Sequence, residues 1–188
     1  MTVAEEITKG EKELSPLSLT DEMADKQKQE ITILGLGNIM MKDDGFGVHF
    51  LRWFENRWTL PDAVRIIEGG VMAYTLLEPV CSCRHLIVID VLKTNDEPGA
   101  IYRFTQAEIE QKLPQPTSAH EVQFLDVLCK AELLGENPAV VFLCIVPVDF
   151  RDMNMELSPL LREQFPVMEK FLIEELDHHG IRPVKTHA

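Results

Sequence analysis

The chain has 188 residues, of which 45% are hydrophobic and 26% are charged, and this length suits one globular domain with a full hydrophobic core. The formal net charge of −13 at pH 7 argues against nucleic acid or an anionic membrane surface as a partner. No apolar run reaches the roughly 20 residues that a membrane-spanning helix needs, and the N-terminus is too polar for a secretory signal. We therefore expect a cytoplasmic protein whose partners include neither nucleic acid nor membrane.

Residues 1–29 mix charged and hydroxyl side chains with a few apolar residues that follow no period. Such a segment buries too little apolar surface to offset the entropy of ordering it, so it predicts a disordered or weakly structured N-terminal tail. Residues 30–184 are patterned throughout and are expected to form a single α/β domain.

The patterned region opens with a short apolar strand at residues 31–35, which ends in a Gly-Leu-Gly-Asn sequence at residues 35–38. Two adjacent acids, Asp43 and Asp44, come next, followed by a helix with an aromatic residue at every fourth position. This is the first strand-to-helix turn of an α/β domain, where such folds commonly bind their ligands. We expect one of the two acids to cap the helix N-terminus and its neighbour to face a cleft.

A glycine-rich turn after a strand is also typical of nucleotide-binding loops. The dinucleotide fingerprint, however, requires a third glycine where Met40 stands, and the chain has no Gly-Lys-Ser/Thr sequence. Asp43 and Asp44 would also repel a phosphate group at the helix N-terminus. The turn therefore favours cation binding or proton transfer over phosphate binding.

The rest of the sequence alternates apolar strands with helices. Strands are predicted at residues 64–67, 85–90, 100–104 and 139–146, and further helices at residues 72–80, 119–134 and 159–179. The strand at residues 100–104 is expected at the sheet edge and antiparallel, and Pro166 is expected to kink the last helix. The alternation predicts a three-layer α/β/α sandwich around a mostly parallel twisted sheet.

Chemically active side chains stand at the ends of several of these elements. Asp44 follows the first strand and Asp90 ends the third, so a strand order beginning 2-1-3 places both in one crevice. Glu68, at the end of the second strand, is a further candidate for this crevice. His120 is predicted to be the second residue of a helix capped by Ser118, where the helix dipole disfavours an imidazolium ion. Two carboxylates and a neutral imidazole suit nickel or zinc.

Each of these residues also has a purely structural interpretation. Asp44 can serve only as a helix cap, Asp90 can close a strand by accepting hydrogen bonds from loop amides, and His120 can face solvent. The joint placement of the three favours a metal-binding or catalytic site. As polar cleft residues, they are expected to contribute little to the free energy of unfolding.

Taken together, these motifs resemble those of the hydrogenase maturation endopeptidases. The resemblance covers residues 31–181 and rests on the glycine and aspartate pattern of residues 35–47, Glu-Gly-Gly at residues 68–70, Asp90, and Ser-x-His at residues 118–120. It implies a cytoplasmic protease that removes a C-terminal extension from the large-subunit precursor of a nickel–iron hydrogenase. It further implies that Asp44, Asp90 and His120 bind the nickel already inserted in that precursor and form the catalytic site.

The chain departs from the family pattern at two positions in this set. Asp44 stands where relatives often carry glutamate, which is one methylene longer, so Asp43 is a candidate contributor to the site. Ala119 precedes the histidine, where proline is common. The nickel is expected to come from the substrate, because two carboxylates and one imidazole make an open site that lacks the thiolates of structural zinc.

Two other functions remain open at the level of sequence. One is a nucleotide-binding oxidoreductase of Rossmann type, with Gly35 and Gly37 in the phosphate loop and Glu68 as the acid that binds ribose. The other is a non-catalytic metallochaperone that binds the hydrogenase precursor. The sequence motifs of serine hydrolases and of common zinc proteases do not occur.

Overall fold

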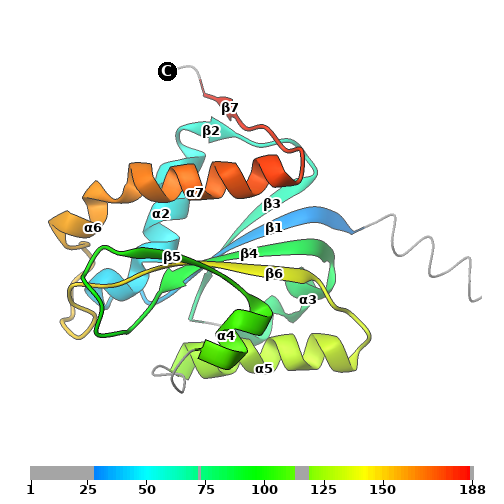
Figure 1. The fold of residues 1–188 in the computed structure, drawn as a ribbon, viewed down its shortest axis with the longest axis horizontal. Coiled ribbons are helices and arrows are strands. Elements are labelled where there is room, and N and C mark those ends of the chain that lie inside the picture. The colour runs from blue at the N-terminus through cyan, green and yellow to red at the C-terminus, as the bar shows by residue number, and fades with distance from the viewer. Residues whose placement is uncertain (1–27, 72, 113–118, 187–188) are drawn as a thin grey trace, which may run out of the picture.

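The computed structural model describes residues 28–71, 73–112 and 119–186. A five-stranded sheet with the order β3-β1-β4-β6-β5 lies at the centre of this region (Figure 1). Its strands are β1 (Gln29–Leu36), β3 (Val64–Gly70), β4 (Cys83–Val91), β5 (Ile101–Thr105) and β6 (Ala139–Ile145). Neighbouring strands are parallel except for β5, which runs antiparallel to β6 at the edge. The predicted mostly parallel sheet with an antiparallel edge strand is confirmed.

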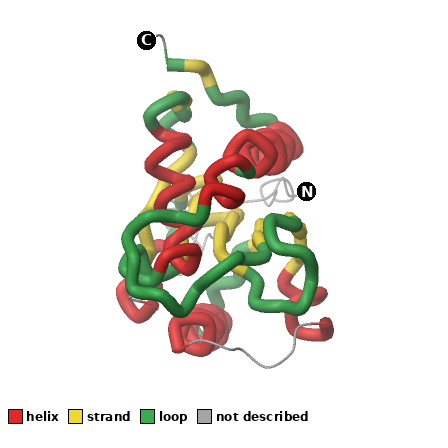
Figure 2. Tube along the Cα trace, turned by 90° about the vertical axis from the view of Figure 1, so that its left-hand side faces the viewer, coloured by secondary structure: helices red, strands yellow, loops and turns green. Residues whose placement is uncertain are grey.

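Helices cover both faces of the sheet and give the predicted three layers (Figure 1, Figure 2). One face carries α2 (Phe46–Glu55), α6 (Pro159–Glu163) and α7 (Phe165–His178), and the other carries α3 (Leu77–Cys81), α4 (Gln106–Lys112) and α5 (Ala119–Leu133). Short 3-10 turns, η1 (Lys42–Gly45) and η2 (Ala73–Leu76), precede α2 and α3. A small antiparallel ribbon pairs β2 (Trp58–Thr59) with β7 (Val184–Lys185).

The central strands are apolar on both sides because helices pack against each face of the sheet. In β1, Ile31 and Ile33 belong to the core under α2 and α7, whereas Leu34 and Leu36 belong to the core under α3 and α5. All four side chains are buried. The alternation of strand side chains between two buried faces explains why this segment is a nearly continuous hydrophobic run.

Two local expectations need correction. Pro166 does not kink a continuous helix, because the chain forms two helices, α6 and α7, with Gln164 between them. Pro166 lies in the first turn of α7, where its missing N–H leaves no hydrogen bond unmade. Gln29, which the sequence pattern assigns to the expected tail of residues 1–29, is the first residue of β1; residues 1–27 lie outside the described residues. None of the helices in the described ranges is long and apolar enough to cross a bilayer.

The strand order creates a topological switch point at the carboxyl end of the sheet. The chain passes from β1 through α2 to β3 over one face, and from β3 through α3 to β4 over the other. After β1 the chain goes to β3 on one side, whereas after β4 it goes to β5 and β6 on the other side. The loops that follow β1 and β4 therefore diverge, as the predicted order 2-1-3 requires. Figure 2 looks onto this side of the molecule, where the long loops gather.

The start of α2 packs directly against the sheet through a glycine. A Cβ atom on Gly47 would lie 2.2 Å from the carbonyl oxygen of Ile89 and 2.6 Å from that of Leu36. No side chain fits at these distances, so a glycine is required where α2 approaches β1 and β4. This approach brings the loop that carries Asp43 and Asp44 to the end of β4, which contacts η1.

Replacing Gly47 by alanine should therefore destabilise the fold, although alanine normally stabilises a helix by about 1 kcal/mol over glycine. We expect the free energy of unfolding to fall by about 3 kcal/mol, because the methyl group must displace backbone oxygens of two strands. Urea denaturation measures the loss. Gly135→Ala is the control: Gly135 has φ +83° and open space around its Cβ position, so only about 1 kcal/mol of backbone strain is expected. Equal losses in the two variants would contradict the packing argument.

Candidate active site

The chain reverses sharply after β1 at Gly37. Its φ of +111° is a conformation that other residues rarely adopt, and a Cβ atom there would lie 1.7 Å from the carbonyl oxygen of Asp44. The N–H of Gly37 donates to the carbonyl of Gly70 at 3.0 Å. The turn is thus filled by the backbone of its own loop, whereas a phosphate-binding loop presents open backbone N–H groups to its ligand. This packing disfavours the Rossmann-type nucleotide site.

Asp44 is buried at this turn and is held by a backbone amide and an ammonium group. The residue is 5% exposed, and its Oδ2 accepts a hydrogen bond from the N–H of Asn38 at 3.0 Å. Its Oδ1 lies 2.9 Å from Nζ of Lys93, whose side chain is only 9% exposed. The prediction that Asp43 or Asp44 caps α2 is wrong: Gly45 is the N-cap residue, and within the described residues no side chain makes a capping hydrogen bond there.

The buried ion pair also revises the expected energetics of Asp44. Removing one member of such a pair leaves an uncompensated charge in a poorly solvated site, which typically costs about 3 to 5 kcal/mol. Asp44 is therefore coupled to the stability of the crevice through Lys93. A substitution at this position must be judged by both its activity and its free energy of unfolding.

Asp90 lies at the carboxyl end of β4. It is in register with Cys144 of β6, is 6% exposed, and accepts a hydrogen bond at Oδ1 from the N–H of Val91 at 2.7 Å. Lys93, three residues further along, reaches back to Asp44. Asp44, in η1 after β1, and Asp90, in β4, therefore follow or end neighbouring strands, and both are buried at the carboxyl end of the sheet.

The structure describes the backbone of His120 but not its side chain. α5 begins at Ala119, so His120 is the second residue of a helix, as predicted. α5 leads into β6, which is parallel to β4, so α5 begins on the carboxyl-end side of the sheet (Figure 1). The predicted cap Ser118 and the side chain of His120 lie outside the described residues. Among the side chains that are described, no three His, Cys, Asp or Glu residues form a metal-binding group.

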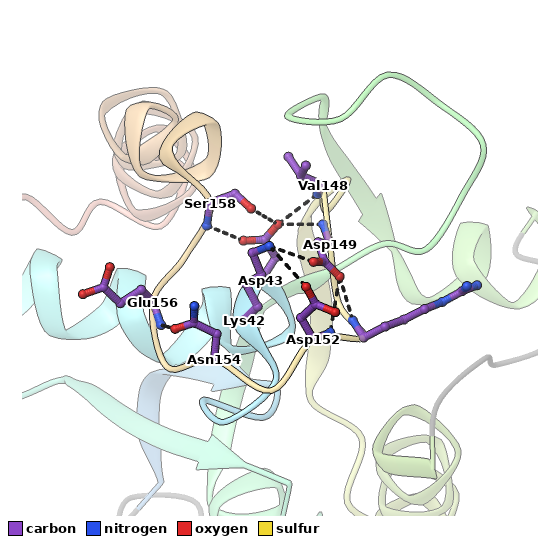
Figure 3. Close-up of polar contacts among 9 residues, drawn as sticks. Lys42, Asp43, Val148, Asp149, Asp152, Asn154, Glu156 and Ser158 are labelled. Atoms are coloured by element: carbon purple, nitrogen blue, oxygen red, sulfur yellow. Dashed lines mark hydrogen bonds and ion pairs between the residues drawn. The ribbon is translucent and has the colours of Figure 1, made fainter.

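Asp43 has a structural role that the sequence did not reveal (Figure 3). The residue is fully buried and accepts four hydrogen bonds, from the N–H groups of Val148, Asp149 and Ser158 at 3.0, 2.9 and 2.7 Å and from the hydroxyl of Ser158 at 2.8 Å. All four donors lie between β6 and α6. Asp43 therefore joins the loop after β1 to the loop after β6, and its carboxylate is committed to these donors rather than to a ligand.

A second group of contacts holds the same two loops together (Figure 3). Lys42, with φ +49°, donates its N–H to the carbonyl of Asn154 at 2.6 Å and its ammonium to Asp149 at 2.7 Å. This ion pair, together with the N–H of Arg151, holds the pKa of Asp149 well below its usual range. The only sequence signal for these contacts was the position of Asp149 and Ser158 after a strand that ends at the same edge of the sheet.

Glu68, a candidate for the crevice, pairs instead with a helix. Its side chain is 39% exposed and accepts hydrogen bonds of 2.8 and 2.7 Å from the guanidinium of Arg52 in α2. The guanidinium lowers the pKa of Glu68. This contact links β3 to α2 and engages both carboxylate oxygens of Glu68.

Comparison with known proteins identifies the family. A model of the hydrogenase maturation protease family matches residues 48–175. This chain belongs to that family. The maturation protease is 33% identical to the hydrogenase expression/formation protein HupD of Bradyrhizobium diazoefficiens over 164 residues, 86% of this chain and 85% of the relative. It is 29% identical to the hydrogenase 2 maturation protease of Escherichia coli over 160 residues, 84% of this chain and 97% of the relative.

Solved structures share the fold of this maturation protease. The hydrogenase maturating endopeptidase HybD of Escherichia coli matches with a TM-score of 0.78 at 25% identity, over 83% of this chain and 97% of that chain. The [NiFe] hydrogenase maturation protease HybD of Thermococcus kodakarensis matches with a TM-score of 0.65 at 28% identity, over 78% of this chain and 98% of that chain. The resemblance seen in the motifs is confirmed, and the protein is a peptidase of this family.

The contacts of Asp43 predict a large structural cost for its removal. Asp43→Ala leaves four donors, two of them buried and two partly buried, without their acceptor, so we expect the free energy of unfolding to fall by about 4 kcal/mol. Urea denaturation monitored by circular dichroism measures the change. Asp152→Ala is the matched control in the same loop contact, because the Asp152 side chain is 75% exposed and 4.0 Å from Lys42, and should cost less than about 1 kcal/mol. An Asp43→Ala protein as stable as the control would refute the structural role.

Proposed function

We propose that this maturation protease removes a C-terminal extension from the nickel-loaded large-subunit precursor of a nickel–iron hydrogenase, and that Asp44, Asp90 and His120 bind the precursor's nickel. The observation that carries the proposal is that Asp44, buried in η1 against the end of β4, already pairs with a cation, the ammonium of Lys93, at 2.9 Å. A carboxylate that pairs with an ammonium ion in a poorly solvated site is also suited to binding a metal ion. The names of its relatives, which are hydrogenase maturation proteases, support the hydrogenase as the substrate.

The three groups suit nickel in type and in number. Two carboxylates and an imidazole are ligands that a borderline divalent metal accepts, and three protein ligands leave coordination positions for groups of the precursor. His120 in the first turn of α5 favours a neutral ring, because the positive end of the helix dipole disfavours an imidazolium ion. Such an incomplete site binds a free ion weakly and binds a metal that a docked protein already holds much more strongly.

The reaction is the hydrolysis of a peptide bond. Water adds to the scissile carbonyl, the C–N bond breaks, and the departing amine takes up a proton. The precursor's nickel supplies Lewis acidity, toward either the carbonyl oxygen or the attacking water. In a second route, the carboxylate of Asp44 or Asp90 accepts the proton of the attacking water as a general base. Both routes require the crevice to hold the metal and the C-terminal segment of the precursor together.

Conservative replacement of the three residues tests the site. Asp44→Asn, Asp90→Asn and His120→Gln should each slow processing by about 100-fold or more, since losing a group that acts in the transition state typically costs about 2.7 kcal/mol or more. Mass spectrometry of the precursor after incubation measures the rate, and thermal unfolding of each variant reports stability. Glu68→Gln, which removes an acid outside the crevice, should process normally. Wild-type rates in all three site variants would refute the assignment.

The dependence on nickel is a separate prediction. The purified enzyme should carry no stoichiometric metal, and it should cut nickel-loaded precursor about 100-fold faster than apo-precursor, because the metal is its strongest anchor on the substrate. The two precursors are offered side by side, and the metal content of the enzyme is measured by elemental analysis. Equal cleavage of both precursors, or one tightly bound zinc ion per chain, would contradict the proposal.

A further inference from the structure

A buried lysine lies beside the proposed metal ligands. Only 9% of the Lys93 side chain is exposed, although lysine is among the residues that are least often buried. Its Nζ lies 2.9 Å from Oδ1 of Asp44 and 5.2 Å from the centre of the Phe150 ring. Lys93 follows Asp90 by three residues, so its side chain reaches from the end of β4 to the loop after β1.

The two oxygens of Asp44 are both engaged. Oδ2 accepts the hydrogen bond of Asn38, and Oδ1 is paired with Lys93. A divalent ion that binds Oδ1 must replace the ammonium, because two cations at one carboxylate oxygen in a buried site repel each other strongly. Metal binding and the Lys93–Asp44 ion pair therefore compete for the same atom.

We propose that Lys93 is a specificity-determining residue: it acts as a resident cation that blocks Asp44 in the free enzyme, so that free divalent ions are excluded and only a metal fixed in the precursor displaces it. This proposal rests on the proposed role of Asp44 as a metal ligand. A free ion can bind Oδ1 only in those molecules in which Asp44 is not paired with Lys93, so its apparent affinity is reduced in proportion to that fraction. If the pair is formed in roughly 99% of molecules, the apparent affinity for a free ion falls about 100-fold. A metal carried by a docked protein has a high effective concentration, which overcomes this competition.

The ammonium of Lys93 already lies over the Phe150 ring, 5.2 Å from its centre, while it is paired with Asp44. The ring is only partly buried, and the guanidinium of Arg151 lies 5.5 Å from its centre. Phe150 follows directly after Val148 and Asp149, whose N–H groups are fixed by Asp43, so the ring is held beside the crevice. The flexible stem of lysine lets the ammonium leave the carboxylate and move outward past the ring while it keeps its charge.

Calorimetric titration of the purified enzyme with nickel(II) alone, at neutral pH, tests the inference. Lys93→Met removes the charge and keeps the length of the side chain, so nickel should bind at least about tenfold more tightly than to the wild type. Lys93→Arg keeps the cation and should stay within about threefold of the wild type. Lys42→Met is the matched control, because it removes the charge of a nearby loop lysine that is paired with Asp149 instead of Asp44. The double variant Asp44→Asn/Lys93→Met should lose the gain in affinity.

These variants separate the failure of this inference from the failure of the proposed function. If Lys93→Met binds nickel as weakly as the wild type while Asp44→Asn abolishes processing, Asp44 is a site residue but Lys93 does not block it. If Asp44→Asn processes the precursor normally, the metal-ligand assignment itself fails. Should Lys93→Met fold poorly, Lys93→Gln replaces it, and the rise in melting temperature on adding nickel becomes the readout. A rise no larger than that of the wild type would overturn the inference.

Discussion

One buried carboxylate holds the functional end of this fold together. Asp43 accepts all four of its hydrogen bonds from residues that follow it by 105 to 115 positions in the chain. Closing a loop of this length costs conformational entropy, and hydrogen bonds to a charged acceptor are the strong kind that offset it. The positions of Phe150, the start of α6 and the loop that carries Asp44 all depend on this connection, so irregular segments at this end of the sheet are held in place.

Asp43 and Asp44 are neighbours with opposite roles, and the local backbone explains why. Both lie in the 3-10 turn η1, where successive side chains point about 120° apart because the turn has about three residues per revolution. Asp43 points toward the loop after β6, and Asp44 points toward Lys93 at the end of β4. Three backbone N–H groups and the hydroxyl of Ser158 stabilise the carboxylate of Asp43. The ammonium of Lys93 compensates the carboxylate of Asp44.

The doubly wound sheet positions the turn that carries Asp43 and Asp44. Gly47 allows α2 to press against the backbones of β1 and β4, and Asp44 after β1 and Asp90 at the end of β4 are both buried. An unpaired carboxylate in such a place is costly, and the ammonium of Lys93 lies 2.9 Å from Oδ1 of Asp44.

The sequence by itself determined the layered α/β architecture, the antiparallel edge strand and the placement of Asp44 and Asp90 at the carboxyl end of the sheet. These properties follow from local periodicity and from strand endings, which act within a few residues of the chain. The roles of Asp43, Asp44 and Lys93 were decided only by tertiary structure. A helix-capping rule assigned one acid to α2, but donors more than 100 residues away offered the carboxylate of Asp43 four hydrogen bonds, and Lys93 offered Asp44 a full charge. Contacts of this kind leave no periodic trace in the sequence, because their strength depends on burial and on which loops the fold brings together.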